Sequence, residues 1–232
     1  MKNKPLLAAL FSGGKDSCYA VYLMKNKGYS VECLISIKSK NPDSYMFHTP
    51  NIHLVELQAK AMQIPLLSHE TNGEKEKELK DLKEAILKAK RQYKIEGIIT
   101  GALFSNYQRE RIEKICSELN LEVFSPLWQM DPEREIREIL GAGFKFIIAK
   151  IAADGLDESW LGREISQKDV DKLVELNKKT GISIAFEGGE AESLVVGGPL
   201  FKSKIKIISA EKVMENKCTG VYSIKEAGLK TN

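Results

Sequence analysis

Hydrophobic and polar residues alternate in blocks along the first half of the chain, and the blocks have the lengths of strands and helices. Short apolar runs of strand length are each followed by a stretch whose apolar residues recur at helical spacing. The predicted strands span residues 5–11, 31–38, 64–68, 97–100 and 121–125. The predicted helices span residues 15–27, 53–63, 74–93 and 107–120.

This order of strands and helices predicts βαβ crossovers, because two parallel strands need a long connection and a helix supplies it. Crossovers of one hand place helices on both faces of the sheet. We therefore expect an α/β fold: a Rossmann-like, open, parallel five-stranded sheet with helices on both faces. Ligands of such sheets bind beyond the carboxyl ends of the strands.

The pattern changes after Pro126, where a second group of elements begins. Its predicted elements are a helix over 132–143, a strand over 144–153, a helix over 166–181, and strand-like alternation from Ser193 onward. Ser166 and Gly181 are suited to cap the second of these helices. We expect a smaller C-terminal α/β unit, joined to the first near residues 128–131, and place the two domains at 1–129 and 130–232.

The motif SGGKDS at residues 12–17 lies between the first predicted strand and the first predicted helix. A glycine-rich turn of this kind exposes backbone N–H groups at a helix N-terminus, which is a binding site for phosphate. Lys15 adds a positive charge, and Ser12 and Ser17 add hydroxyl donors. Asp16 is suited to cap the helix or to support a magnesium ion. The alternative is a purely structural turn with an exposed lysine.

Two common nucleotide motifs do not fit this loop. Lys15 is followed by Asp16, and no second glycine lies four residues before Gly14, so the loop is not a Walker A motif. The glycine spacing also differs from the dinucleotide-binding G-x-G-x-x-G.

Composition excludes several classes of protein. The 232 residues carry 35 basic and 32 acidic side chains, a net charge of +3, so no direct nucleic-acid binding is expected. The first apolar run is too short for a membrane span or a secretory signal, which predicts a cytoplasmic protein without a membrane partner. The four cysteines are far apart and are expected to be reduced and mostly buried.

SGGKDS in this setting resembles the loop of the PP-loop ATP pyrophosphatases, whose fold is of the adenine nucleotide alpha-hydrolase type. That resemblance implies cleavage of ATP between the α and β phosphates, with the loop holding the departing pyrophosphate. Further stretches narrow the likeness to one family, the diphthine–ammonia ligases. They are DSYMFHT (43–49), GALFSNYQRERIEKICSELNLEVFSPLW (101–128), KIAADGLDESWLG (150–162) and EGGEAESLVVGGPLF (187–201).

The resemblance implies a reaction and its participants. ATP, with Mg²⁺, adenylates the carboxylate of diphthine, a modified histidine on translation elongation factor 2, and ammonia displaces AMP to give diphthamide. No cysteine lies in the sequence context of a glutaminase nucleophile, so free ammonia is the expected donor. The oligomeric state is not predicted.

The resemblance, together with residue chemistry, implies a set of site residues. Guanidinium groups suit phosphate oxygens, so one of Arg109 and Arg111 is expected to bind phosphate, and Arg109 is favoured. The alternative is that both lie on the solvent-exposed face of a helix. The expected catalytic residues are Lys15, Asp16, Arg109, Glu187, Glu190 and Glu192, with Asp16 as metal ligand. The expected ATP-binding residues are Ser12, Gly13, Gly14, Lys15, Asp16, Ser17, Gly101, Tyr107 and Arg109. The expected substrate-binding residues are Tyr45, Met46, His48, Trp128, Gly188 and Gly189.

The chain departs from the family pattern within EGGEAES, where Ala191 replaces a usual aromatic residue and Ser193 a usual threonine. Alanine loses a ring that could stack on a base or a cation, which leaves the identity of the carboxylate substrate open. The alternative hypotheses are a PP-loop enzyme that adenylates another carboxylate or a tRNA base, as in tRNA thiolation, and an ATP-binding module without catalysis.

Overall fold

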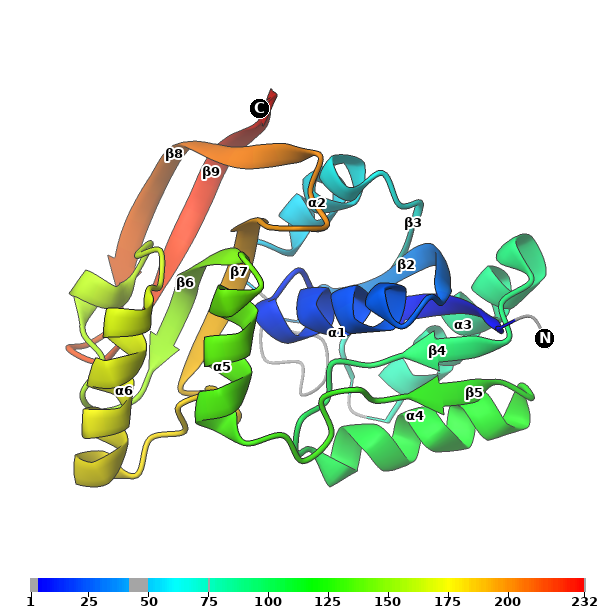
Figure 1. Ribbon diagram of the computed structural model, residues 1–232, viewed down its shortest axis with the longest axis horizontal. Coiled ribbons are helices and arrows are strands. Elements are labelled where there is room, and N and C mark those ends of the chain that lie inside the picture. Colours follow the sequence, from blue (N-terminus) through cyan, green and yellow to red (C-terminus); the bar gives the residue numbers. More distant parts are fainter. Residues whose placement is uncertain (1–3, 42–49, 75, 232) are drawn as a thin grey trace.

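The structure, a computed structural model of the chain, describes residues 4–41, 50–74 and 76–231 (Figure 1). The strands are β1 (Leu6–Leu10), β2 (Ser30–Ser39), β3 (Leu66–Thr71), β4 (Gly97–Ile99), β5 (Glu122–Phe124), β6 (Lys145–Ala152), β7 (Ala191–Gly197), β8 (Ser203–Met214) and β9 (Thr219–Thr231). The α-helices are α1 (Lys15–Asn26), α2 (Val55–Met62), α3 (Glu78–Tyr93), α4 (Asn106–Glu118), α5 (Pro132–Gly141) and α6 (Gln167–Thr180). Two short 3-10 helices are η1 (Ile52–Leu54) and η2 (Glu158–Trp160).

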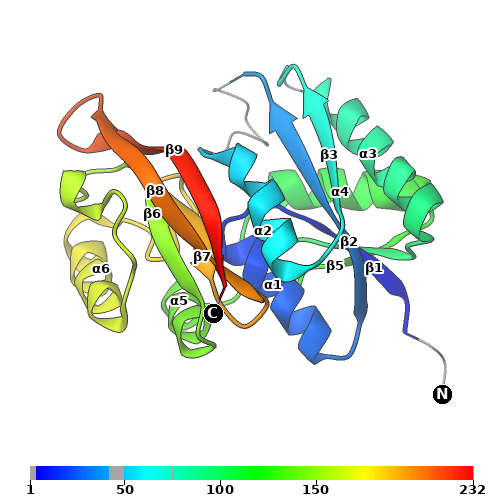
Figure 2. The ribbon, with the colours of Figure 1, turned by 90° about the horizontal axis from the view of Figure 1, so that it is seen from above.

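The first five strands form one parallel sheet in the order β3-β2-β1-β4-β5. Helices α1 and α2 pack against one face, where they share a core with Leu7 and Ala9 of β1. Helices α3 and α4 cover the other face and pack on Ala8 of β1 (Figure 2). The predicted α/β fold is therefore confirmed: successive side chains of a strand point to opposite faces, and both faces are buried.

The third strand lies later in the chain than the sequence predicted, over Leu66–Thr71 instead of residues 64–68. Gln63 adopts a left-handed conformation (φ +55°) at the end of α2. The next residue, Ile64, still donates its N–H to the carbonyl of Ala59 in the helix. Ile64, the first residue of the predicted strand, thus belongs to the turn that ends α2, and the Pro65 carbonyl accepts from the Leu34 N–H of β2 (2.8 Å) just before β3 begins.

The last four strands form a separate sheet in the order β7-β6-β9-β8, with antiparallel pairing throughout. The predicted smaller α/β unit is confirmed, and α5 and α6 pack on it through residues such as Ile136 and Leu173. Ser166 and Gly181 (φ +77°) flank α6 as expected. The predicted helix over 132–143 ends at Gly141.

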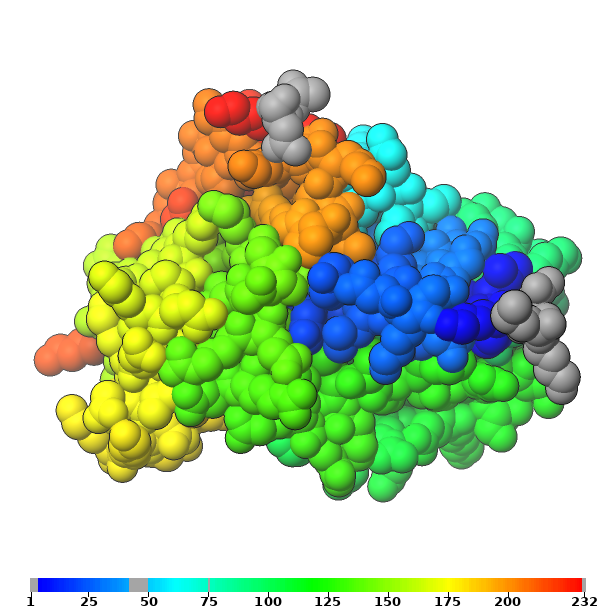
Figure 3. All heavy atoms as spheres, viewed as in Figure 1, coloured from blue at the N-terminus to red at the C-terminus, as the bar shows by residue number. Residues whose placement is uncertain are grey.

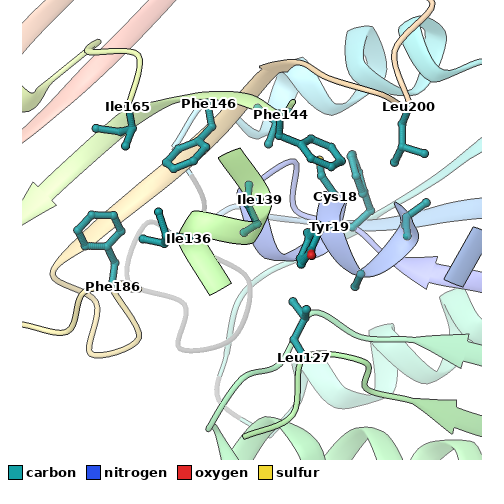
Figure 4. Close-up of a cluster of buried hydrophobic side chains, with 14 of the residues drawn as sticks. Cys18, Tyr19, Leu127, Ile136, Ile139, Phe144, Phe146, Ile165, Phe186 and Leu200 are labelled. Carbon is teal, nitrogen blue, oxygen red and sulfur yellow. The ribbon is translucent and has the colours of Figure 1, made fainter. Parts of the chain in front are cut away.

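The two sheets share one hydrophobic cluster. Cys18 and Tyr19 of α1 pack with Ile136 and Ile139 of α5 and with Phe144, which precedes β6 (Figure 4). All four aliphatic or aromatic members of this contact are at most 4% exposed, as is the Cys18 thiol. The apolar contact fixes the start of α1 against the second unit. No helix in the described part of the chain has the length and apolar character that a membrane span requires.

Candidate active site

Residues 12–17, which we call the glycine loop, connect β1 to α1 at the carboxyl end of the central strand. Strands β2 and β4 lie on opposite sides of β1, and all three strands are parallel. The loop after β1 therefore lies at the point where the order of the strands in the sheet reverses. Helix α1 begins at Lys15, and Gly14 is its N-cap. The loop thus combines a helix N-terminus with the usual ligand position of an open parallel sheet.

Strand β7 of the second sheet holds the glycine loop in place. The Val195 N–H donates to the carbonyl of Gly13 (3.0 Å), and the Lys15 N–H donates to the Ser193 hydroxyl (3.1 Å). The fully buried amide of Gln58 in α2 donates to the carbonyls of Gly13 and Val195, each at 2.8 Å. Two elements that are distant from the loop in sequence, α2 and β7, therefore fix its conformation.

Two glycines permit this close packing. Gly13 has a φ of +80°, a conformation that residues with a side chain rarely adopt. A Cβ atom on Gly101, after β4, would lie 2.8 Å from the Ser17 nitrogen. Gly101, predicted to bind ATP, therefore lets its loop lie directly against the start of α1.

The Lys15 side chain is buried between two carboxylates. Its ammonium group pairs with Asp16 and lies 3.3 Å from Oε2 of Glu135 in α5. Burial alone would lower the pKa of Lys15, but the neighbouring Asp16 and Glu135 carboxylates outweigh burial and raise the pKa. Lys15 consequently keeps its positive charge. Burial and the nearby Asp16 raise the pKa of Glu135, against the opposite effect of Lys15.

A cleft of about 540 Å³ opens beside the glycine loop. Many of the residues predicted from the sequence line it. They are Ser12, Gly14, Lys15, Asp16, Ser17, Gly101, Glu187, Gly188, Gly189 and Glu192. The structure thus brings the glycine loop and the EGGEAES stretch, about 170 residues apart, to one cavity.

The three glutamates of EGGEAES have different surroundings. Burial and the nearby Asp16 raise the pKa of Glu187 to about 7, while Lys15 opposes this rise. The Glu190 carboxylate accepts hydrogen bonds from the N–H groups of Ser183 (2.9 Å) and Gly188 (2.8 Å). Glu190 therefore shapes the turn rather than lining the cleft.

Glu192 lies in the cleft at the start of β7. Its carboxylate is 3.4 Å from the ammonium group of Lys150 on the neighbouring strand β6. Burial raises the pKa of Glu192, and Lys150 partly offsets that rise. Glu192 is thus a half-buried, paired carboxylate.

Tyr107, Arg109 and Trp128 lie outside the cleft lining, as does Gly13. The Arg109 Nε donates to Glu113 (2.6 Å), and its guanidinium lies 4.5 Å from the ring centroid of Trp128. The Tyr107 hydroxyl donates to Glu76 (3.0 Å). The roles of Tyr107, Arg109 and Trp128 in binding or catalysis stay predictions. Tyr45, Met46 and His48 lie outside the described residues.

The cleft also contains residues that the sequence did not single out. Ser105 and Gln108 line it from the start of α4, where the Ser105 hydroxyl accepts from the Gln108 N–H (3.3 Å). Ser105 is the N-cap of α4, and its spacing of three residues from Gln108 is typical of a helix start, which the sequence could have shown, but that pattern does not indicate a cleft. Glu135 offered no such signal, because Glu133 and Glu138 in the same helix have the same charge.

In the described part of the chain, no three His, Cys, Asp or Glu side chains are grouped so that they could hold a metal ion. A magnesium ion that accompanies a nucleotide needs fewer ligands, because phosphate oxygens and water complete its shell. Asp16 has a side chain that is 28% exposed and lines the cleft. The donor set therefore fits a nucleotide-bound magnesium ion and does not fit a metal site made by protein alone.

Comparison with known proteins agrees with this arrangement. Residues 6–123 match the family model described as diphthamide synthase N-terminal domain, and residues 131–229 match the one described as diphthamide synthase C-terminal domain. This chain belongs to the diphthamide synthase family. The family resemblance read from the motifs is confirmed.

Three curated relatives illustrate the similarity, each carrying the name diphthine–ammonia ligase. The mouse protein is 37% identical over 229 residues, which cover 90% of this chain and 85% of the mouse protein. The human protein is 36% identical with the same coverage. The zebrafish protein is 32% identical over 228 residues, covering 90% of this chain and 89% of the relative.

Proposed function

We propose that this protein is an ATP-dependent ligase that amidates the diphthine carboxylate of translation elongation factor 2 with ammonia. The products would be diphthamide, AMP and pyrophosphate. The observation that supports this proposal best is the single cleft shared by a phosphate-binding type of loop and a group of carboxylates. Membership in the diphthamide synthase family supports the choice of substrate.

Activation of the carboxylate is the first chemical problem, because oxide is a poor leaving group. In the proposed reaction, a diphthine carboxylate oxygen forms a bond to the α-phosphorus of ATP, and the bond from that phosphorus to pyrophosphate breaks. The N-terminus of α1, Lys15 and the hydroxyl groups of Ser12 and Ser17 would hold the departing pyrophosphate. Magnesium would supply charge neutralisation at the phosphates, with Asp16 as its protein ligand.

Amide formation is the second step, in which ammonia attacks the acyl-adenylate and AMP leaves. The attacking nitrogen must lose a proton. Glu187 lies in the cleft, and its pKa of about 7 suits a group that accepts a proton near neutral pH. We assign Glu187 this role of general base, and Glu190 the role of holding the turn that carries Glu187.

The test is an assay of the purified protein with ATP, ammonium chloride and diphthine-bearing elongation factor 2. We expect release of AMP and pyrophosphate together with formation of diphthamide. Mass spectrometry of the elongation factor measures the diphthamide. Lys15→Ala should lower AMP release at least ~100-fold, since a positioned charge at the reacting phosphates is lost. Lys25→Ala, an exposed change in the same helix, is the control and should leave the rate unchanged.

Two outcomes would contradict the proposal. Release of ADP instead of AMP would exclude cleavage between the α and β phosphates. Release of AMP with an unmodified elongation factor, but with sulfur incorporated into tRNA, would assign the protein to a different PP-loop reaction.

A further inference from the structure

Glu135 is a buried carboxylate that the proposed chemistry does not use. It belongs to α5, the first helix of the C-terminal unit, and is 0% exposed. Its Oε2 atom lies 3.3 Å from the Lys15 ammonium. Its Oε1 atom is buried with no hydrogen-bond partner in the described part of the chain. A carboxylate buried in this way is costly, so its presence calls for a reason other than stability.

Attachment of α5 to α1 does not explain Glu135, because other contacts already join the two helices. Ile136 and Ile139 pack on Cys18 and Tyr19 in the shared hydrophobic cluster (Figure 4). One turn further along, the Tyr19 hydroxyl donates to Glu138 (3.0 Å). The two helices abut on the molecular surface as well (Figure 3). A leucine in place of Glu135 would extend the apolar contact without burying a polar group.

The geometry at Lys15 gives a better explanation. Lysine has a long, flexible side chain and presents its charge as a point, so its direction must be set by its partners. Asp16 is the neighbour in sequence and is expected to turn toward a magnesium ion in the nucleotide complex. Glu135 is then the buried carboxyl group that keeps the Lys15 ammonium in place beside the glycine loop.

We propose that Glu135 is a positioning residue: it fixes the Lys15 ammonium for contact with nucleotide phosphate and so makes α5 part of the nucleotide site. This inference rests on the proposed function in one respect, namely that nucleotide phosphates bind at the glycine loop. It assigns to the C-terminal unit an acidic side chain that acts through the lysine of the N-terminal unit.

A double-mutant cycle in nucleotide binding tests the proposal. The four proteins are wild type, Lys15→Ala, Glu135→Gln and the double variant, and the probe is α,β-methylene-ATP with magnesium, titrated by calorimetry. We expect Glu135→Gln to weaken binding about tenfold in the wild-type background and less than about twofold in the Lys15→Ala background, because coupled residues are not additive. Glu138→Gln, which alters the other polar contact between the helices, is the control and should change the affinity less than about twofold.

Three results would overturn the proposal. A simple charge effect predicts the opposite sign, since removal of a negative charge near an anionic ligand tightens binding. Tighter binding by Glu135→Gln would therefore contradict positioning, as would an equal loss in both backgrounds or an equal loss in Glu138→Gln. If Glu135→Gln does not fold, the same cycle with Glu135→Asp, which keeps the carboxyl group but withdraws it from Lys15, gives the same comparison.

The cycle separates this inference from the proposed function, because it measures binding and not turnover. A wild-type protein that binds the analogue but forms no diphthamide would contradict the proposed function and leave the coupling between Lys15 and Glu135 open to the same measurement. Diphthamide formation with no coupling between Lys15 and Glu135 would contradict the inference alone.

Discussion

At the scale of single residues, the glutamates of the EGGEAES stretch differ in what their surroundings do to them. Glu187 has a pKa raised to about 7 by burial and by the nearby Asp16, whereas Glu190 is bound by two backbone N–H groups. A group that titrates near neutral pH suits proton transfer, and a group held by backbone donors suits a structural role. The proposed division of labour between these two glutamates follows from this difference.

The raised pKa of Glu187 predicts a specific pH dependence of stability. Between its ordinary pKa of 4.5 and about 7, the folded protein keeps a proton that the unfolded chain releases. The contribution of Glu187 is therefore neutral below about pH 4, becomes increasingly destabilising up to about pH 7, and is constant above it. In wild type, this contribution lowers the free energy of unfolding as the pH rises from about 4 to about 7. Glu187→Gln should remove this contribution.

Urea denaturation of both proteins at a series of pH values between 4 and 8 checks this prediction. Glu190→Gln serves as a comparison, since it should lower stability through the turn without removing the decline. Parallel curves for wild type and Glu187→Gln would show that Glu187 ionises at its ordinary pKa.

The sequence predicted that a residue belongs to the site only where that residue lies in a recognisable motif. Lys15, Asp16 and Gly101 lie in stretches with recognisable patterns, and the structure places all three at the cleft. Gln58 and Glu135 are buried polar residues inside amphipathic helices, where periodicity describes which face is apolar but not which polar residue is buried. Their partners, Gly13 and Lys15, are 45 and 120 residues away, a separation that no local pattern reports.

At the scale of elements, the glycine loop is held by packing between backbones as well as by side chains. A Cβ atom on Gly101 would lie 2.8 Å from the Ser17 nitrogen and 2.9 Å from the Asp16 carbonyl carbon. Backbone atoms at this distance cannot move aside as the end of a flexible side chain can. A side chain at position 101 must therefore displace the start of α1, the loop after β4, or both.

Gly101→Ala is accordingly expected to destabilise the protein by about 1–3 kcal/mol and to weaken nucleotide binding. The matched control is Gly141→Ala at the end of α5, where a Cβ atom would meet nothing within 4 Å. That change should stabilise the protein slightly, by up to about 1 kcal/mol, because alanine is the better helix former. Thermal unfolding and calorimetric titration of both variants measure the two effects; equal behaviour of the two variants would contradict the role of Gly101.

The sequence predicted individual elements better than the way they pair. The strands and helices of the first unit follow from periodicity, and their alternation is sufficient to predict the parallel sheet. In the second unit, β6 lies between β7 and β9, although β7 follows it by almost forty residues. Antiparallel strands admit several orders with similar burial of their apolar residues, so alternation from Ser193 onward did not determine this arrangement.

At the scale of the whole molecule, the two sheets share one hydrophobic cluster. The hydrophobic cluster that contains Cys18 and Tyr19 continues through Ile136, Ile139 and Phe144 into the second unit. An interface of this kind, apolar and continuous with both cores, differs from the polar contacts of domains that move independently. The domain boundary between residues 129 and 130 stays a prediction. Whether residues 1–129 fold without the rest of the chain can be tested.

We expect a fragment of residues 1–129 to fail to fold by itself, because α1 would expose its side of the shared cluster to water. The full chain should unfold in a single transition seen alike by far-ultraviolet circular dichroism and by tryptophan fluorescence, since Trp128 and Trp160 lie on either side of the boundary. Binding of a hydrophobic dye to the fragment, compared with the full chain, checks the first expectation. A cooperative unfolding transition of the isolated fragment would contradict it.

The hydrogen bonds from β7 and α2 to the glycine loop have a consequence for the evolution of such proteins. Gln58 contacts the loop from the N-terminal unit, whereas Ser193 and Val195 contact it from the C-terminal unit. We therefore expect a substitution on one side to require a matching substitution on the other. A recombinant that joins the N-terminal half of this protein to the C-terminal half of a distant relative would combine contacts that never diverged together. Divergence in this lineage is therefore expected to proceed by compensating point substitutions rather than by exchange of halves.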